Sequence, residues 1–246
     1  MKNIKLVLEY DGTKYAGWQR QKNANTIQQM LEESIYSITG ERLQVIGSSR
    51  TDAGVHARGF VANFKTNSSI PETKFSAALN SKLPEDIVIL ESSLVPDEFH
   101  ARYSSSGKTY SYTILNRFQP SAIDRNYVYH YRGELDIKAI REACNYFIGT
   151  HDFAAFKNTG SSVKSTVRTI SAVEVIKSSD YIKYYITGDG FLYNMVRIMI
   201  GTLIEVGIGK IKPEHIEYIL LSRDRTKAGK SAPASGLCLE KVYYNT

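Results

Sequence analysis

The sequence predicts an α+β fold in which the order β-α-β-β-α-β occurs twice, once in each half of the chain. Short runs rich in β-branched and aromatic residues alternate with segments whose apolar residues recur at helical spacing. A helix-capping residue precedes a helical segment in each half, Thr26 in the first and Asp136 in the second. With 246 residues, 42% of them apolar, the chain can form two cores. We therefore expect two ferredoxin-like domains, residues 1–104 and 105–246, each with helices on one face of an antiparallel sheet.

In the first half, a strand leads through the loop Asp11-Gly12-Thr13 to a helix that Thr26 caps and Gly40 ends. Pro71 begins a second helix. The expected strands are residues 4–10, 43–48, 60–66 and 87–95, and the expected helices are 26–40 and 71–81.

In the second half, the first strand carries Tyr110 and Tyr112 in alternation, and a loop insertion separates it from the helix that Asp136 caps. Pro213 begins an extra helix before the final strand. The expected strands are residues 109–116, 167–177, 181–187 and 237–244, and the expected main helices are 136–148 and 191–206.

Composition favours an intracellular protein with an anionic partner. No apolar stretch of about 18 residues is free of charge, so no membrane span is expected. The first residues lead into a strand rather than a secretion signal. Cys144 and Cys238 lie in apolar elements and are expected to be reduced core residues, which suits the cytoplasm. A net charge of +6 and a pI near 9.1 favour a negatively charged ligand.

Basic residues cluster at three places: after the first strand, in the segment 47–59 and near residues 223–230. Tyr15 and Trp18 are interleaved with the first cluster, a mixture suited to phosphate contacts and base stacking. A solvated face explains each cluster equally well when it is taken singly.

The segment Gly47–Gly59 is the strongest candidate for a site. Asp52 is its only acid and stands between Arg50 and Arg58. Its glycines permit sharp turns and close approach of the backbone to a ligand. On residue types alone, a tight turn in which Asp52 bonds its own backbone explains the segment at least as well.

Arg197 is the single cation in the apolar run 191–200. Burying an unpaired guanidinium is prohibitive, so Arg197 must reach either solvent or an anion, such as Asp52 across a domain cleft. The five histidines show no metal-ligand spacing and no Cys-x-x-Cys is present, so no metal site is expected.

Taken together, the motifs resemble those of the tRNA pseudouridine synthase A family along essentially the whole chain. The segment Arg50-Thr51-Asp52-Ala53-Gly54-Val55-His56-Ala57 is similar to the family's signature loop, with Ser49 where the family commonly has glycine. Further segments match in order: residues 9–13, 17–21, 99–102, 108–112, 151–153, 195–197 and 234–237.

The resemblance implies a cofactor-independent enzyme that converts uridine to pseudouridine in the anticodon stem-loop of tRNA, at positions 38, 39 and 40 in tRNA numbering. It also implies two ferredoxin-like halves that meet in one continuous sheet beside a basic active-site cleft. A homodimer is expected, with tRNA as partner and no membrane or other protein partner.

By the same resemblance, Asp52 is the nucleophile, attacking either C1′ of the ribose or C6 of the base. Arg50 and Arg197 would hold and orient its charge. Tyr110 would stack on the target base and supply a phenol for the proton at C5. The remaining expected substrate contacts are Leu237, which meets the base, and His56, Arg58, Asp11, Gln19 and Arg20.

Other readings stay open at this stage. A non-catalytic RNA-binding protein would also use the ferredoxin-like plan and the basic clusters, although the aromatic-rich signature of RNA-recognition modules is not found. A glycosidase-like hydrolase would release free uracil. A paralogue acting on another tRNA position or on ribosomal RNA would carry the same loop.

Overall fold

The computed structural model describes residues 1–158, 160 and 163–245 and confirms the α+β class. The chain divides into two compact units. Unit 1 contains Met1–Ser106 together with the final strand from Cys238 onward, and unit 2 is Gly107–Leu237. The final strand, which the sequence analysis assigned to the second domain, thus groups with unit 1.

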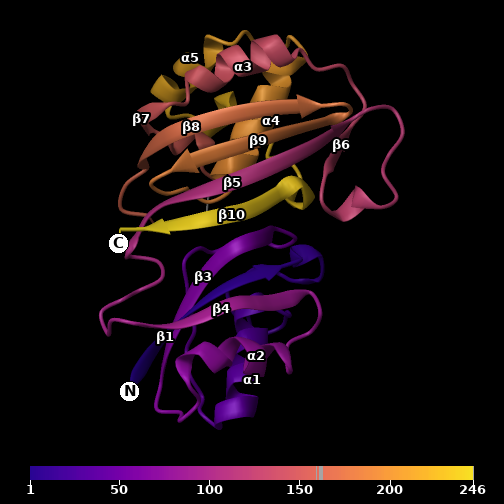
Figure 1. Ribbon diagram of the computed structural model, residues 1–246. Coiled ribbons are helices and arrows are strands. Elements are labelled where there is room, and N and C mark those ends of the chain that lie inside the picture. The colour runs from indigo at the N-terminus through magenta and orange to yellow at the C-terminus, as the bar shows by residue number, and fades with distance from the viewer. Residues whose placement is uncertain (159, 161–162, 246) are drawn as a thin grey trace. The chain divides into compact units, whose positions relative to one another are not determined.

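Unit 1 has the expected order of elements in its first hundred residues (Figure 1). Its strands are β1 (Lys2–Tyr10), β2 (Ile46–Gly47), β3 (His56–Thr66), β4 (Ile87–Val95) and β10 (Leu237–Tyr244), and its helices are α1 (Ile27–Thr39) and α2 (Phe75–Asn80). One-turn 3₁₀ helices occur at Gly12–Lys14 (η1) and Glu72–Lys74 (η2).

In unit 1, β1 lies between β3 and β4 and pairs antiparallel with both. The other edge of β3 pairs antiparallel with β2 at Ala62 and Asn63, and parallel with β10 at His56 and Ala57. The parallel pair departs from the expected wholly antiparallel sheet. It arises because β10 reaches β3 from a distant part of the chain, without a hairpin that would reverse its direction.

The core of unit 1 follows the predicted periodicities. Ile4, Leu6 and Leu8 alternate on β1 and are fully buried, as are Leu31 and Ile35 on α1. The predicted caps of α1 are confirmed as well. The Thr26 side chain accepts from the backbone N–H of Gln29, and Gly40 ends the helix in the left-handed region at φ 74°.

Unit 2 contains two strands that the sequence analysis missed, β6 (Tyr129–Tyr131) and β7 (Gly149–Asp152). Both are too short to show an alternating pattern. The longer elements are β5 (Ser105–Asn116), α3 (Ile137–Asn145), β8 (Val167–Ser178), β9 (Tyr181–Gly188), α4 (Met195–Gly207) and α5 (His215–Ser222). The strand order is β5-β9-β8-β7, all antiparallel, and β6 adds to β5 in parallel.

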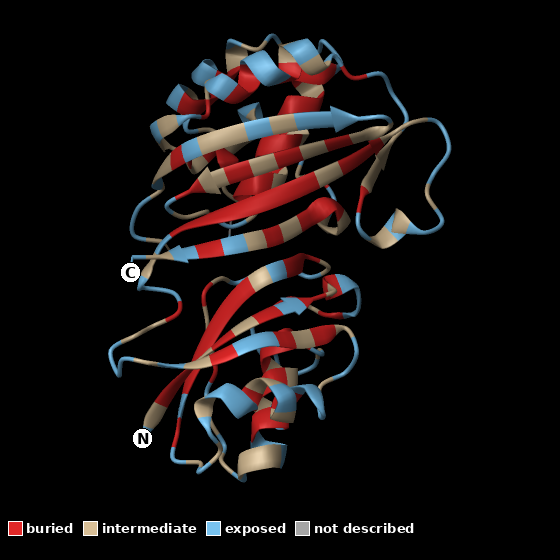
Figure 2. Ribbon diagram, viewed as in Figure 1, coloured by how far each residue is buried: buried red, intermediate tan, exposed pale blue. Residues whose placement is uncertain are grey.

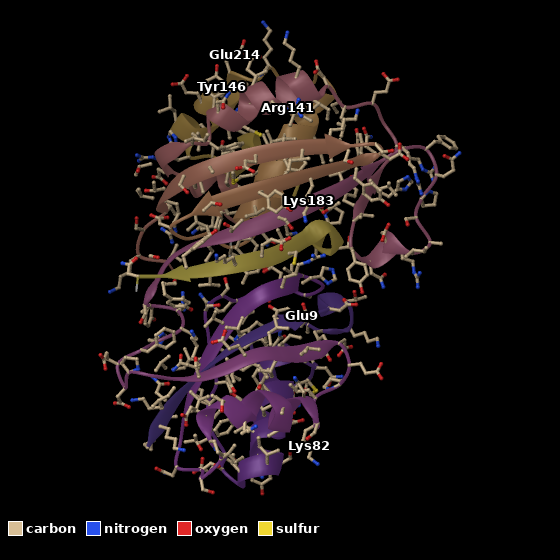
Figure 3. All side chains as sticks on the ribbon, viewed as in Figure 1. Glu9, Lys82, Arg141, Tyr146, Lys183 and Glu214 are labelled. Carbon is tan, nitrogen blue, oxygen red and sulfur yellow. The ribbon has the colours of Figure 1, made fainter. Side chains whose placement is uncertain are left out.

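In unit 2, strand β5 is buried over most of its length (Figure 2). Helix α3 packs against both α4 and β8. From α3, the guanidinium of Arg141 donates to the Val175 carbonyl on β8 at 3.3 and 3.4 Å (Figure 3). Asp136 caps α3 as predicted, accepting from the backbone N–H groups of Lys138 and Ala139.

Three boundaries near the candidate site differ from the predictions. The strand expected at 43–48 is only two residues long, and β3 starts at His56 instead of Phe60. His56 and Arg58 therefore lie on a strand, not in a loop. Helix α4 starts at Met195 rather than at residue 191, because Asn194 adopts the left-handed conformation at φ 61°, which an α-helix cannot include.

Candidate active site

The candidate nucleophile Asp52 lies in the loop of residues 48–55, which joins β2 to β3. Ser48 closes the base of this loop. Its backbone N–H donates to the Val61 carbonyl at 2.8 Å, and its hydroxyl accepts from the Val61 N–H at 3.3 Å. Ser48 is buried, so this closure lies inside the protein. The loop is thus anchored at its start to the strand that follows it.

A tight turn forms the far end of the loop. The Val55 N–H donates to the Asp52 carbonyl at 3.2 Å, and Gly54 has φ 77°. A residue with positive φ at the third position of such a turn favours glycine. The predicted tight turn is therefore present, and Asp52 is its first residue. Its side chain is half-buried.

The segment of residues 10–18 supports the loop through hydrogen bonds. The Trp18 N–H donates to the Thr51 carbonyl at 3.0 Å, and the Gly54 N–H donates to the Tyr15 carbonyl at 3.3 Å. The buried hydroxyls of Tyr10 and Thr51 are 2.8 Å apart. These contacts fall on both sides of Asp52.

Two glycines let the same segment approach the loop backbone closely. A Cβ at Gly12 would lie 2.0 Å from the Val55 carbonyl oxygen. A Cβ at Gly17, whose φ is 96°, would lie 2.5 Å from the Thr51 carbonyl oxygen. Only glycine fits either position without displacing the loop. The backbone of residues 51–55 is therefore held by direct backbone contact.

Tyr15 and Trp18 are part of this support, which corrects their expected role in base stacking. Trp18 is 3% exposed and stacks on Phe60 with ring centroids 4.1 Å apart. Tyr15 is 8% exposed, and its hydroxyl donates to the Asp86 carboxylate at 2.5 Å. Burial and Asp86 raise the pKa of Tyr15. Neither ring offers a free face to a nucleobase.

Asp11 and His56 form a pair next to the loop, where β3 begins. His56 is 6% exposed, and its Nδ1 lies 3.1 Å from the Asp11 carboxylate oxygen Oδ1. The same Nδ1 accepts from the backbone N–H of Gly12 at 3.1 Å. The structure thus brings together two predicted substrate contacts, one of which is almost completely buried.

The other polar candidates of unit 1 are exposed. Arg50, Arg58, Gln19 and Arg20 all have exposed positions, as RNA contacts require. Arg20 also donates to the Glu32 carboxylate at 2.8 Å, so part of its charge is already balanced.

In unit 2, the candidate Tyr110 lies on β5 opposite Ile186 of β9. It is 7% exposed, and its ring packs edge-on against Phe191 with centroids 5.1 Å apart. Its place in a paired strand fixes the direction of the ring.

Arg197 lies in the first turn of α4 and is half-buried. Its Nε donates to the Ala232 carbonyl at 2.7 Å, and one terminal nitrogen donates to the Asn194 side-chain oxygen at 2.6 Å. These two acceptors fix the direction of the guanidinium. The positive charge of Arg197 lowers the pKa of Tyr112, although burial has a larger effect and leaves that pKa raised.

The segment of residues 229–236 connects Arg197 to Leu237, and the sequence analysis missed its role. The Gly229 N–H donates to the Thr202 hydroxyl at 2.9 Å, and the Ala232 N–H donates to the Arg197 carbonyl at 2.9 Å. A Cβ at Gly201 on α4 would lie 1.7 Å from the Lys230 carbonyl oxygen. The pairing of Gly201 with Gly229 is the sequence signal that could have indicated this close contact.

The same segment is attached to β5 just before Leu237. The Tyr112 hydroxyl donates to the Pro233 carbonyl at 2.8 Å, and Gly236 packs on the Tyr112 ring. Leu237, 6% exposed, follows directly. Unit 2 thus gathers the elements that carry Tyr110, Arg197 and Leu237 around one segment.

Two arginines of the basic cluster at residues 223–230 make contacts within the protein. Arg223 pairs with Asp152 at 3.0 Å, and Arg225 donates to the Asn158 side chain and the Ala228 carbonyl. Burial lowers the pKa of Arg225. Lys227 and Lys230 are exposed.

Two further predictions concern metals and membranes. Among residues 1–158, 160 and 163–245, no three His, Cys, Asp or Glu side chains are grouped so that they could hold a metal ion. Over the same residues, no helix has the length and apolar character needed to span a membrane.

Comparison with known proteins identifies the family. The family described as tRNA pseudouridine synthase matches residues 6–104 and 143–245, which include Asp52, Arg197 and Leu237 but not Tyr110. A tRNA pseudouridine synthase A from Clostridium kluyveri is 61% identical over 244 residues, covering 99% of this chain and 100% of the relative. The tRNA pseudouridine synthase A 2 of Clostridium perfringens is 58% identical over 244 residues, with the same coverage.

Among solved structures, a Cbf5-Nop10-Gar1 complex covers 98% of this chain and 50% of that chain, with a TM-score of 0.41 at 11% identity. At that TM-score the likeness is too weak to assign a fold or an activity. The family assignment rests on the sequence relatives and on the family match. This chain belongs to the tRNA pseudouridine synthase family, isomerases that convert uridine in tRNA to pseudouridine.

Proposed function

We propose that this enzyme acts without a cofactor on uridines 38, 39 and 40 in the anticodon stem-loop of tRNA, with Asp52 as the nucleophile. The main observation behind this proposal is that neighbouring backbone segments hold the turn that contains Asp52 in place. Asp52 is the only acid of the loop, and glycine contacts and backbone hydrogen bonds fix the backbone on both sides of it. A reaction that depends on the position of one carboxylate needs such a rigid mounting.

The isomerisation breaks the N1–C1′ bond, forms a C5–C1′ bond, and moves a proton from C5 while N1 gains one. The unperturbed pKa of an aspartic acid is about 3.9, so a carboxylate is ionised near neutral pH without special tuning. The ionised oxygen attacks either C1′ or C6 and leaves again when the new bond forms. Both routes need the same carboxylate and the same release of the C5 proton.

Arg197 and Arg50 are proposed to orient the Asp52 charge and the substrate. The guanidinium of Arg197 is aligned by the Ala232 carbonyl and by Asn194, so it meets an incoming anion in a defined direction. A cation that holds the carboxylate also makes it a poorer nucleophile. We therefore expect the contacts of Asp52 to rearrange when RNA enters.

The target base must leave the stacked stem-loop, which costs a few kcal/mol. Tyr110 is proposed to stack on the extruded base and to take part in removing the C5 proton, and Leu237 to contact the base. Both side chains are almost completely buried and belong to strands. Their fixed directions suit a site that holds the detached uracil while it turns. Arg58, Gln19 and Arg20 are proposed as RNA contacts because they are exposed.

The decisive experiment replaces Asp52 by asparagine and follows tritium release from tRNA labelled at uridine C5. We expect release to stop while tRNA binding changes less than about twofold, because only a reacting group is removed. Asp97→Asn is the matched control, since Asp97 is an exposed carboxylate paired with Lys65 on the same unit. Retention of activity by Asp52→Asn, or loss of binding by the same factor as activity, would exclude Asp52 as nucleophile.

The target positions are tested with unmodified tRNA transcripts and site-by-site mapping of pseudouridine. Modification should fall at positions 38, 39 and 40 and stop when these uridines are replaced by cytidine. Modification elsewhere would identify a different specificity, and free uracil as product would indicate hydrolysis.

Two further proposals rest on the family. We propose a homodimer that works in the cytoplasm, where tRNA is modified. Light scattering of the pure protein should give twice the mass of the 27.7 kDa chain. The monomer mass across the working concentration range would contradict the dimer.

A further inference from the structure

The His56 ring has one nitrogen with two competing neighbours. Nδ1 lies 3.1 Å from the backbone nitrogen of Gly12, which donates to it, and 3.1 Å from the Asp11 oxygen Oδ1, which can only accept when ionised. One ring nitrogen cannot accept the first hydrogen bond and donate the second at the same time. A ring with no proton on Nδ1 accepts from Gly12, whereas a ring that carries a proton on Nδ1 donates to Asp11.

Neither residue of this pair is arranged to hold RNA. His56 is 6% exposed, which leaves almost no ring surface for a phosphate or a base. The Asp11 oxygen nearest to His56 also accepts from the Thr13 N–H at 2.9 Å and from the Thr13 hydroxyl at 2.5 Å. A carboxylate also repels the phosphates of the substrate. The contacts therefore favour a role inside the protein over the substrate contact predicted from the sequence.

A short path of direct contacts leads from this pair to Asp52. Gly12 packs so closely on Val55 that a Cβ at position 12 would lie 2.0 Å from the Val55 carbonyl oxygen. The Val55 N–H in turn donates to the Asp52 carbonyl and closes the turn. His56 itself is the next residue after Val55. A change in which neighbour His56 engages therefore acts directly on the backbone of the turn.

We propose that Asp11 and His56 form a positioning pair that sets the Asp52 turn through the contacts of His56 Nδ1. The proposal rests on Asp52 being the nucleophile. His56 and Asp11 are positioning residues and do not touch the reacting atoms.

The other ionisable groups around the pair have identified neighbours. On the Asp11 side, the backbone carbonyl of Asp86 accepts from the Asp11 N–H. The Asp86 carboxylate accepts from the Tyr15 hydroxyl and lies 3.7 Å from the Lys14 ammonium group. Burial raises the pKa of Tyr15, with Asp86 and Asp11 adding to the effect, so Tyr15 stays neutral near neutral pH. On the strand side, the cross-strand partners are Cys238 for His56 and Tyr10 for Ala57.

The test compares four variants of the full-length enzyme in single-turnover assays and tRNA-binding titrations. His56→Ala removes both interactions, and should lower the single-turnover rate by about 10–100-fold, as loss of a supporting partner typically does, with Kd for tRNA nearly unchanged. His56→Asn keeps an acceptor and a donor near the position of Nδ1, so it should recover most of the rate that His56→Ala loses. Asp11→Asn keeps an acceptor but removes the charge, so it should lower the rate by less than His56→Ala does, with Kd for tRNA nearly unchanged.

His100→Asn is the matched control. The His100 Nδ1 accepts from the backbone N–H groups of Arg102 and Tyr103, so it resembles the Gly12 contact, and the residue belongs to the same unit. Its single-turnover rate and its Kd for tRNA should both stay at the wild-type values.

Three results would overturn the proposal. His56 variants that weaken tRNA binding with an unchanged single-turnover rate would make His56 an RNA contact. A rate in His56→Asn as low as that in His56→Ala would show that the contacts of Nδ1 do not set the turn, and a normal rate in His56→Ala would remove any positioning role. Asp52→Asn separates the two proposals: if it is inactive while the His56 variants behave as wild type, only the positioning proposal fails.

Discussion

The two units hold their candidate residues in different ways. In unit 1, the contacts are between backbone atoms: Gly12 and Gly17 contact the loop that carries Asp52, and main-chain hydrogen bonds connect residues 15–18 to residues 51–54. In unit 2, side chains provide the contacts: the Arg197 guanidinium and the Tyr112 hydroxyl donate to carbonyls of the segment before Leu237. The support of the candidate nucleophile Asp52 therefore tolerates no added atoms, whereas the proposed base-binding side depends on particular donor groups.

The largest effect is expected when a methyl group is added to the unit 1 contact. Gly17→Ala places a Cβ 2.5 Å from the Thr51 carbonyl oxygen at a φ of 96°. Strain and overpacking together should cost about 2–5 kcal/mol of folding free energy. A displacement of about 1 Å at Asp52 should lower kcat by about 100-fold. Thermal unfolding and single-turnover kinetics measure the two effects.

Gly40→Ala is the control for Gly17→Ala, because it adds backbone strain without a close contact. Gly40 also has positive φ, at 74°, but a Cβ there meets nothing within 4 Å. The variant should lose about 1–2 kcal/mol of stability from backbone strain alone and keep its kcat. If Gly17→Ala behaved like Gly40→Ala, close backbone contact would not be what positions the loop.

A smaller effect is expected when Arg197 of unit 2 is changed to lysine. Lysine keeps the charge but cannot reproduce the two fixed directions in which Arg197 donates to Ala232 and Asn194. Hydrogen bonds from a charged donor are worth about 1.5–3 kcal/mol, so kcat should fall by about 10–100-fold. Rates under saturating tRNA measure this loss.

Arg141→Lys is the control for Arg197→Lys. Arg141 also donates through two nitrogens to a backbone carbonyl, that of Val175, but it lies on α3 and is exposed. Its kcat should stay within about twofold of the wild type, as expected for an exposed surface substitution. An equal loss in both variants would mean that the exchange of a guanidinium for an ammonium group, and not the orientation of Arg197, lowers the rate.

The features that sequence predicted best are the ones encoded locally. Thr26, Gly40 and Asp136 each mark a helix end through a hydrogen bond or a backbone conformation within a few residues, and all three appear as expected. The Asp52 turn is similarly local. These signals need no knowledge of the rest of the fold.

The features that sequence missed depend on distant partners. Trp18 was expected to meet a base, but it is covered by Phe60, 42 positions later in the chain. The support of Leu237 depends on the Gly201 and Gly229 backbones meeting, and each glycine alone has many explanations. Residues of this kind acquire a role only when the fold brings their partners to them.

The smallest expected effects come from two facing tyrosines of unit 2. Tyr112 on β5 and Tyr184 on β9 are cross-strand partners and both are fully buried. The Tyr112 hydroxyl donates to the Pro233 carbonyl, whereas the Tyr184 hydroxyl is buried without a hydrogen-bond partner within the described part of the chain. Tyr112→Phe should therefore cost about 1–2 kcal/mol of stability, and Tyr184→Phe should be neutral or stabilising by up to about 1 kcal/mol.

The functional readouts of this pair should differ as well. Tyr112→Phe frees the segment before Leu237 and should lower kcat by a few-fold, because the proposed base contact becomes less well placed. Tyr184→Phe removes an oxygen that has no hydrogen-bond partner within the described part of the chain, so its kcat should stay unchanged. Denaturant unfolding and single-turnover rates measure both variants. Equal effects on stability and rate would show that the hydroxyl of Tyr112 does not fix the Leu237 side of the site, and that packing of the two rings alone supports it.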